Sequence, residues 1–478
     1  MDWNPFLLLL RKIWTLLLTP IILIGGASVP VTQLAGDEAV QATRRDYIYE
    51  NNRLLLGAYS DWVAHRGGRT TVDSAASAAL AKKAGLDFLI AGNQGRGVYD
   101  LAQLLDNYGA QGLGVILPDY NGYASMGWSA EDTTDAWLSL TPENYKAHPA
   151  LWGDEVFDEP GAAKFPSLRT ITEHYYTLGT RRMPLINLNP AAKDIEAQLG
   201  WRKYLLPGTR YSDSGIDAYR RYVAAYISAV DTDYLSVDYY PFRVSGGKRH
   251  TSDNWLHVLE TLAEAARDTG RDLWVITQAG GTHGSAADVA MWGEMWVPNT
   301  LPDQLQQDYA SLAFGAKAII YAMLQGGWYA DSSHMLDQDG NKTATYDAVQ
   351  QANAQLRPFA EKYGEYQWLG AYLVNSIKTA GTRYDLSNGL PRNERLKLSS
   401  RDGLLVGCFD QKEGDGKAYV IVNMMELLGE KTAKCAVNFP KGKAVTVYGG
   451  GEAKVYDYGG KVELTLEPGD GRFITVCA

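Results

Sequence analysis

The triplet Asp158-Glu159-Pro160 is the clearest place in the sequence for acid–base chemistry. It closes the predicted strand that contains Trp152, and its proline disfavours helical geometry for the glutamate before it. A carboxyl group beside another acid and under aromatic rings tends to keep its proton at neutral pH. A general acid needs that property, so we expect Glu159 to be a proton donor.

Further polar residues follow the other short apolar runs of the sequence. Amides offer a donor and an acceptor together, and tryptophan rings offer a flat face for a sugar. For any single residue the alternative is a helix cap or a solvated loop acid, which weighs most for Asp61 and Asp119. The expected ligand-binding residues are Asp61, Trp62, Asn93, Asp119, Asp158, Asn187, Asn189, Tyr240, Gln278, Gln325 and Trp328.

Eight strand-like runs, alternating with segments of helical period, carry these residues within 46–365. Eight strands with crossovers predict a (β/α)8, or TIM, barrel, whose active site lies at the carboxyl ends of the strands. A doubly wound sheet would have a Gly-rich phosphate turn after its first strand, and the sequence has none there. The predicted strands are 54–59, 87–91, 112–117, 151–157, 184–188, 234–239, 273–278 and 318–323.

Residues 366–478 have a different pattern. Short alternating runs between Gly-rich turns predict a small antiparallel β-sandwich, which would brace the barrel. The three cysteines of the chain, Cys408, Cys435 and Cys477, all lie in this part. They are too few and too widely spaced for a disulfide framework or a zinc site, so we expect buried thiols.

Residues 1–45 read as an N-terminal leader, or an apolar helix, followed by a linker. Two apolar stretches flank Arg11-Lys12, and the small residues 25–28 follow, in the order of a secretory leader. The apolar stretch is too short and interrupted for a stable membrane span. We therefore expect a secreted or extracytoplasmic protein, or a cytoplasmic one if residues 1–27 instead form a structural helix.

The composition narrows the class of partner. A net charge of −10 without a basic cluster argues against nucleic acid. The chain has 13 Trp and 30 Tyr against 10 Phe, and rings with a polar edge suit carbohydrate ligands. No serine-hydrolase, zinc-protease or phosphate-loop motif occurs, so we expect neither cofactor nor metal. Residues 337–341 resemble half of a calcium loop, but later positions lack its Gly and Glu, which favours a hairpin turn.

Three motifs in this order resemble the clan-A (β/α)8-barrel glycoside hydrolases, and most closely the bacterial proteins described as family 42-like or β-galactosidase-like. They are the triplet 158–160, Val-Asp-Tyr-Tyr-Pro-Phe at 237–242, and the run 313–321 leading into the eighth strand. The resemblance covers about residues 50–363. It implies a glycosidase acting on a glycan or glycoside, in carbohydrate metabolism or polysaccharide degradation, with Glu159 as acid/base. The residue before this Glu is usually Asn in the clan and is Asp158 here.

The second catalytic carboxylate is less clear. The clan's nucleophilic Glu at the end of strand seven corresponds to Gln278, and a carboxamide is not a competent nucleophile. Strand alternation turns Leu235 and Val237 towards the helices and Asp238 into the barrel, which makes Asp238 our first candidate. Glu294, after strand seven, is the second candidate, although it is equally well explained as a solvated loop acid.

The reaction stereochemistry depends on the spacing of the two carboxyl groups. Retaining enzymes place them roughly 5 Å apart, and inverting enzymes about 6.5–9.5 Å apart. An aspartate as short as Asp238 would lie low in the barrel and leave room for a water, which favours inversion. The alternative to an enzyme is a non-catalytic carbohydrate-binding barrel, which Gln278 in the nucleophile position supports.

Overall fold

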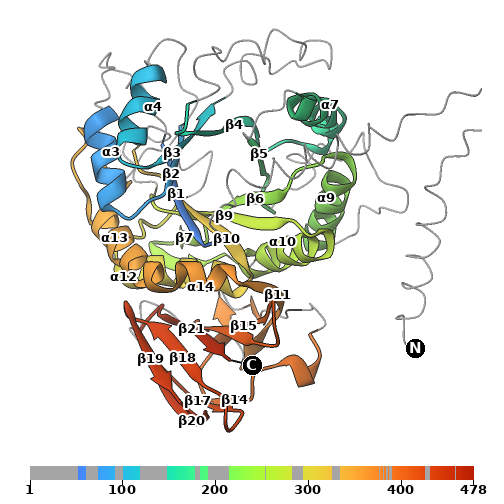
Figure 1. The fold of residues 1–478 in the computed structure, drawn as a ribbon, viewed down its shortest axis with the longest axis vertical. Coiled ribbons are helices and arrows are strands. Elements are labelled where there is room, and N and C mark those ends of the chain that lie inside the picture. The colour runs from blue at the N-terminus through green and yellow to red at the C-terminus, as the bar shows by residue number, and fades with distance from the viewer. Residues whose placement is uncertain are drawn as a thin grey trace, which may run out of the picture. The chain divides into compact units, whose positions relative to one another are not determined.

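Eight parallel strands close into a barrel in the computed structural model, which describes residues 52–60, 74–91, 101–118, 148–177, 183–191, 215–252, 254–281, 294–325 and, apart from short gaps, 334–477 (Figure 1). Around the barrel the order is β1-β10-β9-β6-β5-β4-β3-β2. The predicted TIM barrel is confirmed, with every strand end within two residues of its expected position. The strands are β1 (Leu55–Ser60), β2 (Phe88–Ala91), β3 (Gly114–Pro118), β4 (Leu151–Asp158), β5 (Met183–Leu188), β6 (Tyr234–Tyr239), β9 (Asp272–Gln278) and β10 (Ala316–Ala322).

Helices surround the barrel (Figure 1), and buried apolar residues of the helices pack in one cluster with those of the strands. Short 3-10 turns at Ala162–Lys164 and Arg357–Phe359 lead into two of them. The helices are α3 (Ser74–Lys83), α4 (Leu101–Ala110), α7 (Phe165–Thr177), α9 (Gly215–Ala229), α10 (Trp255–Thr269), α12 (Leu301–Ala313), α13 (Ala344–Leu356) and α14 (Ala360–Gly364).

Aromatic rings fill the amino-terminal half of the barrel interior. Phe88 packs 5.6 Å from both Trp152 and Trp274, and Tyr234 packs 5.3 Å from Trp274 between ring centroids. Gly114 makes room for this layer, because a Cβ there would lie 2.1 Å from the Trp152 ring. The interior of this half of the barrel is therefore apolar.

Two antiparallel sheets follow the barrel and enclose a core of their own, as the predicted β-sandwich requires. The larger sheet has the order β11-β15-β16-β21-β18-β19, and the smaller one β14-β17-β20. Their strands are β11 (Tyr366–Val374), β14 (Leu398–Ser400), β15 (Leu404–Gln411), β16 (Lys417–Asn423), β17 (Ala433–Phe439), β18 (Val445–Gly449), β19 (Glu452–Tyr456), β20 (Gly460–Leu466) and β21 (Gly471–Val476).

Helix α12 joins the barrel to the β-sandwich, and all of its residues from Asp303 to Ala313 are buried. On the sandwich side, the Gln306 side chain donates to the Asn423 carbonyl at 3.3 Å, and the Trp368 indole donates to the Ala313 carbonyl at 2.8 Å. Because a buried polar side chain without a partner is costly, these bonds fix how the two layers pack.

The structure confirms the prediction of buried thiols for two of the three cysteines, and it does not describe the predicted leader. Cys408 and Cys435 are free, buried thiols, as expected, whereas Cys477 is exposed because it follows the last residue of β21. The leader-like residues 1–27 lie outside the described residues. Within the described part of the chain, no helix combines the length and the apolar composition needed to cross a bilayer.

Candidate active site

Strand β4 delivers two carboxyl groups to the carboxyl end of the barrel. Asp158 is its last residue, and Glu159 follows with a left-handed φ of 48°. That conformation is uncommon for a residue with a side chain, and two bonds hold it. The Glu159 amide donates to the Asn187 carbonyl at 2.9 Å, and the Asn189 side chain donates to the Glu159 carbonyl at 2.7 Å.

Helix α9 buttresses the same turn from outside the barrel. The Tyr222 hydroxyl donates to the carbonyl of Pro160 at 2.7 Å and accepts from the Asn189 amide at 3.3 Å. Tyr222 is fully buried and stacks on Tyr219 with 5.8 Å between ring centroids. The turn that carries Glu159 is thus fixed on both sides.

Asn187 on β5 ties strand β4 to strand β6. Its Nδ2 donates to Asp158 Oδ1 at 3.1 Å and to Asp238 Oδ1 at 2.8 Å. Its Oδ1 accepts from the Ser236 hydroxyl at 3.0 Å, which fixes the orientation of the amide. Leu235 and Val237 pack on the helix side of β6, so Ser236 and Asp238 face the interior.

Glu159 and Asp238 form a pair of neighbouring carboxyl groups whose charges interact. Burial raises the pKa of Glu159 well above its usual value, and the charges of Asp238 and Asp158 raise it further. Burial, then the charge of Asp158, raises the pKa of Asp238 to about 7, against the opposing effect of the Asn187 hydrogen bond. Glu159 keeps part of its surface exposed, whereas Asp238 is 6% exposed. The pair therefore holds a proton at neutral pH, on its more accessible member.

Glu155 is a further interior carboxyl group that the sequence analysis missed. It is 1% exposed, pairs in register with Leu185, and accepts a hydrogen bond from the Tyr59 hydroxyl at 3.4 Å. A β-bulge between Glu155 and Phe157 turns both Glu155 and Asp158 inward, although simple alternation would place them on opposite faces. Glu155 thus adds another acid to the barrel interior, earlier along β4 than Asp158 and Glu159.

The Gln278 side chain is hydrogen-bonded to backbone groups on all sides of its carboxamide. It is 1% exposed, and its Oε1 accepts from the Phe242 amide at 3.0 Å. Its Nε2 donates to the carbonyls of Trp296 at 2.7 Å and Gly280 at 3.1 Å, and lies 3.3 Å from that of Phe242. Its carboxamide is therefore occupied by backbone groups, and the expected role in substrate binding stays a prediction.

The remaining predicted residues are scattered. Glu294 is exposed, and its carbonyl accepts from the Val244 amide. Tyr240 is half-buried just after β6, and the half-buried Gln325 donates to the Asp337 carbonyl at 3.2 Å. Five predicted residues lie outside the described residues, namely Asp61, Trp62, Asn93, Asp119 and Trp328.

The calcium-like segment is a hairpin turn, as expected. Asp337 Oδ1 accepts from the amides of Asp339 and Asn341, and Leu336 pairs with Lys342 across the turn. Its carboxylate thus closes the loop. Across the described residues, no three His, Cys, Asp or Glu side chains are grouped so as to hold a metal ion.

Comparison with known proteins adds a likeness of fold. No protein-family model matches the sequence, and no curated protein matches it. Similar solved structures include an uncultured Clostridium sp. β-glucuronidase (10% identity, TM-score 0.42, covering 63% of this chain and 50% of that chain) and the Faecalibacterium prausnitzii β-glucuronidase (13%, 0.41, 64% and 49%). A third is a glycosyl hydrolase family 2 member from Bacteroides cellulosilyticus (11%, 0.39, 89% and 58%).

These neighbours all carry glycosidase names, and this chain spans about half of the length of the two β-glucuronidases. At such identities and with TM-scores below 0.5, the likeness assigns no activity to this chain. The family 42-like resemblance stays a prediction, and the functional argument depends on the carboxyl pair itself.

Proposed function

We propose that this chain is a glycoside hydrolase in which Glu159 is the general acid and Asp238 is the second catalytic carboxylate. The observation that carries the proposal is that Asn187 joins Asp158, beside Glu159, to Asp238 at the carboxyl ends of β4 and β6, where burial raises the pKa of both Glu159 and Asp238. Two carboxyl groups that share a proton at neutral pH supply both the proton donor and the anion that cleavage of an acetal needs.

In the proposed reaction Glu159 gives its proton to the glycosidic oxygen as the bond to the anomeric carbon breaks. Asp238 attacks that carbon and forms a glycosyl ester, which water then hydrolyses while Glu159 takes up a proton from the water. Asn187 and Ser236 hold Asp238 in place throughout. The second carboxylate then comes from β6, in place of the strand-seven Glu to which Gln278 corresponds in the resemblance.

This arrangement favours retention of anomeric configuration over the inversion that the sequence argument favoured. That argument needed space for a water between the two carboxyl groups. The charge of Asp238 raises the pKa of Glu159, so we place the two carboxyl groups close together, as in a retaining pair, rather than roughly 6.5–9.5 Å apart as in an inverting one. Proton NMR of the first-formed sugar anomer distinguishes the two outcomes.

The second candidate function is a carbohydrate-binding barrel without catalysis. Gln278 favours it, because the resemblance would match this side chain to the clan-A nucleophile, and the side chain is hydrogen-bonded to backbone groups. In that case the carboxyl pair would bind sugar hydroxyls and release no product.

A panel of nitrophenyl glycosides separates the two functions. We expect the wild type to release nitrophenol from at least one member and the double variant Glu159→Gln/Asp238→Asn to release none above background. Asp308→Asn is the matched control, since Asp308 is a fully buried carboxyl on α12 outside the site, and its activity should match the wild type. Binding of a glycoside by the wild type without any release would support the binding function and refute hydrolysis.

The proposal also covers the organisation of the whole chain. Residues 46–365 would be the catalytic barrel, 366–478 a bracing β-sandwich, and 1–45 a leader and linker for export of a polysaccharide-degrading enzyme. Limited proteolysis with mass spectrometry tests these bounds, since cuts in a stable barrel core would contradict them.

A further inference from the structure

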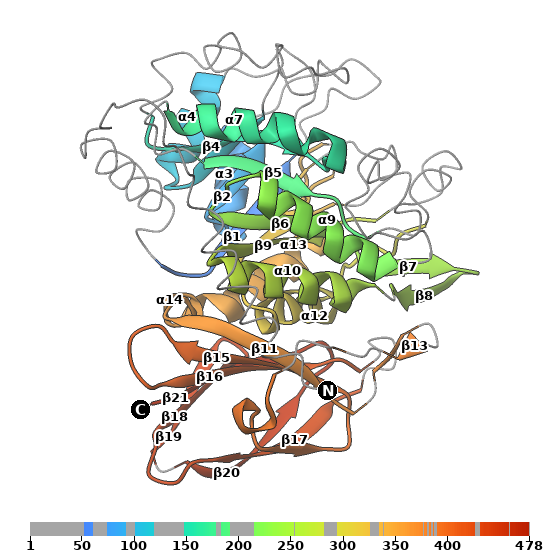
Figure 2. The ribbon, with the colours of Figure 1, turned by 90° about the vertical axis from the view of Figure 1, so that its right-hand side faces the viewer.

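A β-hairpin that the sequence analysis did not predict projects from the barrel just after the strand that carries Asp238. Its strands are β7 (Phe242–Ser245) and β8 (Lys248–Thr251). Gly246 and Gly247 form the tip, both with positive φ as a tight two-residue hairpin turn requires. Figure 2 shows the hairpin extending past the ends of α9 and α10, on the side to which β6 runs.

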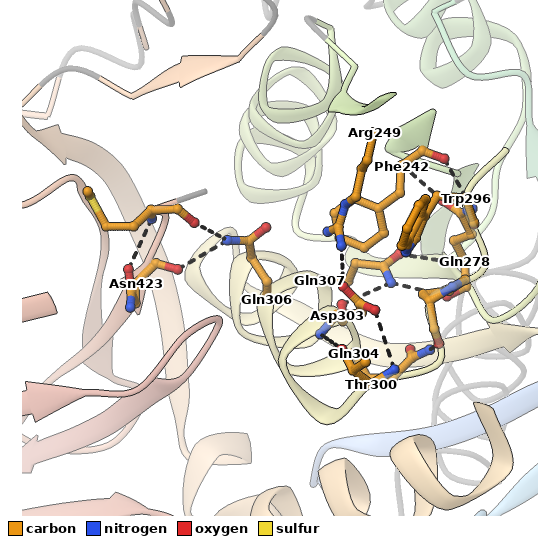
Figure 3. A network of polar contacts seen from close by, with 12 residues as sticks. Phe242, Arg249, Gln278, Trp296, Thr300, Asp303, Gln304, Gln306, Gln307 and Asn423 are labelled. Atoms are coloured by element: carbon orange, nitrogen blue, oxygen red, sulfur yellow. Dashed lines mark hydrogen bonds and ion pairs between the residues drawn. The ribbon is translucent and has the colours of Figure 1, made fainter. Parts of the chain in front are cut away.

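The base of the hairpin is held by a buried polar network (Figure 3). Gln278 bonds to both backbone groups of Phe242, and Arg249, whose side chain is 3% exposed, forms an ion pair with Asp303 of α12. The Arg249 guanidinium also lies 4.1 Å above the Phe242 ring and 5.7 Å from that of Trp296. A hairpin anchored in this way is a rigid arm, because moving it would leave buried polar groups without partners.

The other face of the hairpin is cationic. Cross-strand pairing places Arg243 opposite His250, and Ser245 opposite Lys248. Since residues two apart share a face, these four lie together, opposite to the face of Phe242 and Arg249. Lys248 is exposed, and Arg243 and His250 are half-buried.

This charge contrasts with the rest of the chain. Residues 242–251 contain no acid, although the chain as a whole carries a net charge of −10. The exposed Glu294 lies beside the hairpin in the backbone pairing, because its carbonyl accepts from the Val244 amide. A rigid, basic arm beside a carboxyl pair suits a ligand that carries negative charge along its length.

We propose that the hairpin 242–251 binds an anionic polysaccharide, whose carboxylate or sulfate groups contact Arg243, Lys248 and His250. The proposal rests on the proposed function, because it names the substrate class of the same site. Nucleic acid fits this face less well, since its one ring is that of the half-buried His250, whereas a strand of bases stacks on a series of exposed rings.

The test is affinity electrophoresis of the full chain in gels that contain polygalacturonate, dextran sulfate or neutral dextran. We expect retardation by one or both of the polyanions, weakening with added NaCl, and none by dextran. Polygalacturonate alone would identify carboxylates as the recognised groups, dextran sulfate alone would identify sulfates, and both together would show recognition of charge.

The variant Arg243→Gln/Lys248→Gln should weaken polyanion binding roughly tenfold, because it removes two partly exposed charge contacts. Lys441→Gln/Lys454→Gln is the matched control, which removes two exposed lysines of the β-sandwich and should bind like the wild type. Equal binding by the hairpin variant and the wild type, or no polyanion binding at all, would overturn the proposal.

These outcomes are independent of hydrolysis. Polyanion binding through the hairpin without cleavage of any glycoside would support the binding proposal and refute hydrolysis. Cleavage of neutral glycosides without binding of polyanions would support hydrolysis and refute the proposed role of the hairpin.

Discussion

Asp308 on helix α12 should make the stability of the protein fall as the pH rises. The Tyr321 hydroxyl lies 2.9 Å from Asp308 Oδ2 and 2.7 Å from Asn353 Oδ1. The Asn353 Nδ2 donates to the Ala84 carbonyl at 2.8 Å, so its Oδ1 can only accept. One hydroxyl proton cannot serve two acceptors, so Asp308 itself must carry a proton.

The size of the effect follows from the two pKa values of this carboxyl group. Burial raises the pKa of Asp308 to about 8 in the folded chain, from 3.8 in the unfolded chain. Between these values the folded state binds more protons than the unfolded one. The stabilisation is therefore complete below about pH 4 and is lost as the pH rises through 8. At about 1.4 kcal/mol per pH unit, the loss between pH 4 and pH 7 is roughly 4 kcal/mol.

The variant Asp308→Asn isolates this contribution, because its amide still donates to Tyr321 but does not titrate. We expect it to be more stable than the wild type at pH 8, with the advantage shrinking steadily towards pH 4. Urea unfolding followed by tryptophan fluorescence measures the difference, and Glu413→Gln, an exposed carboxyl, is the control. A stability difference that stays constant across this pH range would refute the conclusion that Asp308 is protonated in the folded chain.

Three further predictions concern the site and the leader. The kcat/KM of the wild type should fall as the pH drops below about 7, where Asp238 gains a proton. The variant Asp158→Asn should move this fall to lower pH, because it removes a charge that raises the pKa of Asp238. An unchanged pH profile would contradict the effect of Asp158 on Asp238. Gln278→Ala should lower the urea-unfolding free energy by about 2–4 kcal/mol, since Phe242 and Trp296 lose buried partners; unchanged unfolding would argue against its structural role. N-terminal sequencing after expression in a secreting host should find a start near Ser28, whereas an intact Met1 would favour a structural helix.

The barrel was predictable because its sequence pattern is local. Each strand is a short apolar run, and each helix repeats apolar residues at helical spacing, so the bounds of the strands are found within two residues. Alternation was also sufficient to turn Asp238 into the barrel, because β6 pairs without irregularity with both of its neighbours.

The site was less predictable because its geometry depends on irregular features. A bulge in β4 brings Glu155 inward, and no sequence signal marks the position of that bulge. The role of Gln278 depends on the hairpin beyond β6, whose second strand, Lys248–Thr251, has no apolar residues to alternate with its basic ones. Helix α12 buries charged and amide side chains because the β-sandwich covers its outer face, which its own sequence does not reveal.

The most direct test of the carboxyl pair compares aryl glycosides that have poor and activated leaving groups. Glu159→Gln should lower turnover of the poor leaving group by roughly 10²–10⁴-fold and that of the activated one far less, because only the former needs the proton. Asp238→Asn should abolish turnover of both. A folded Glu159→Gln with near-normal turnover of the poor leaving group, or an active Asp238→Asn beside an inactive Glu294→Gln, would contradict the assignment.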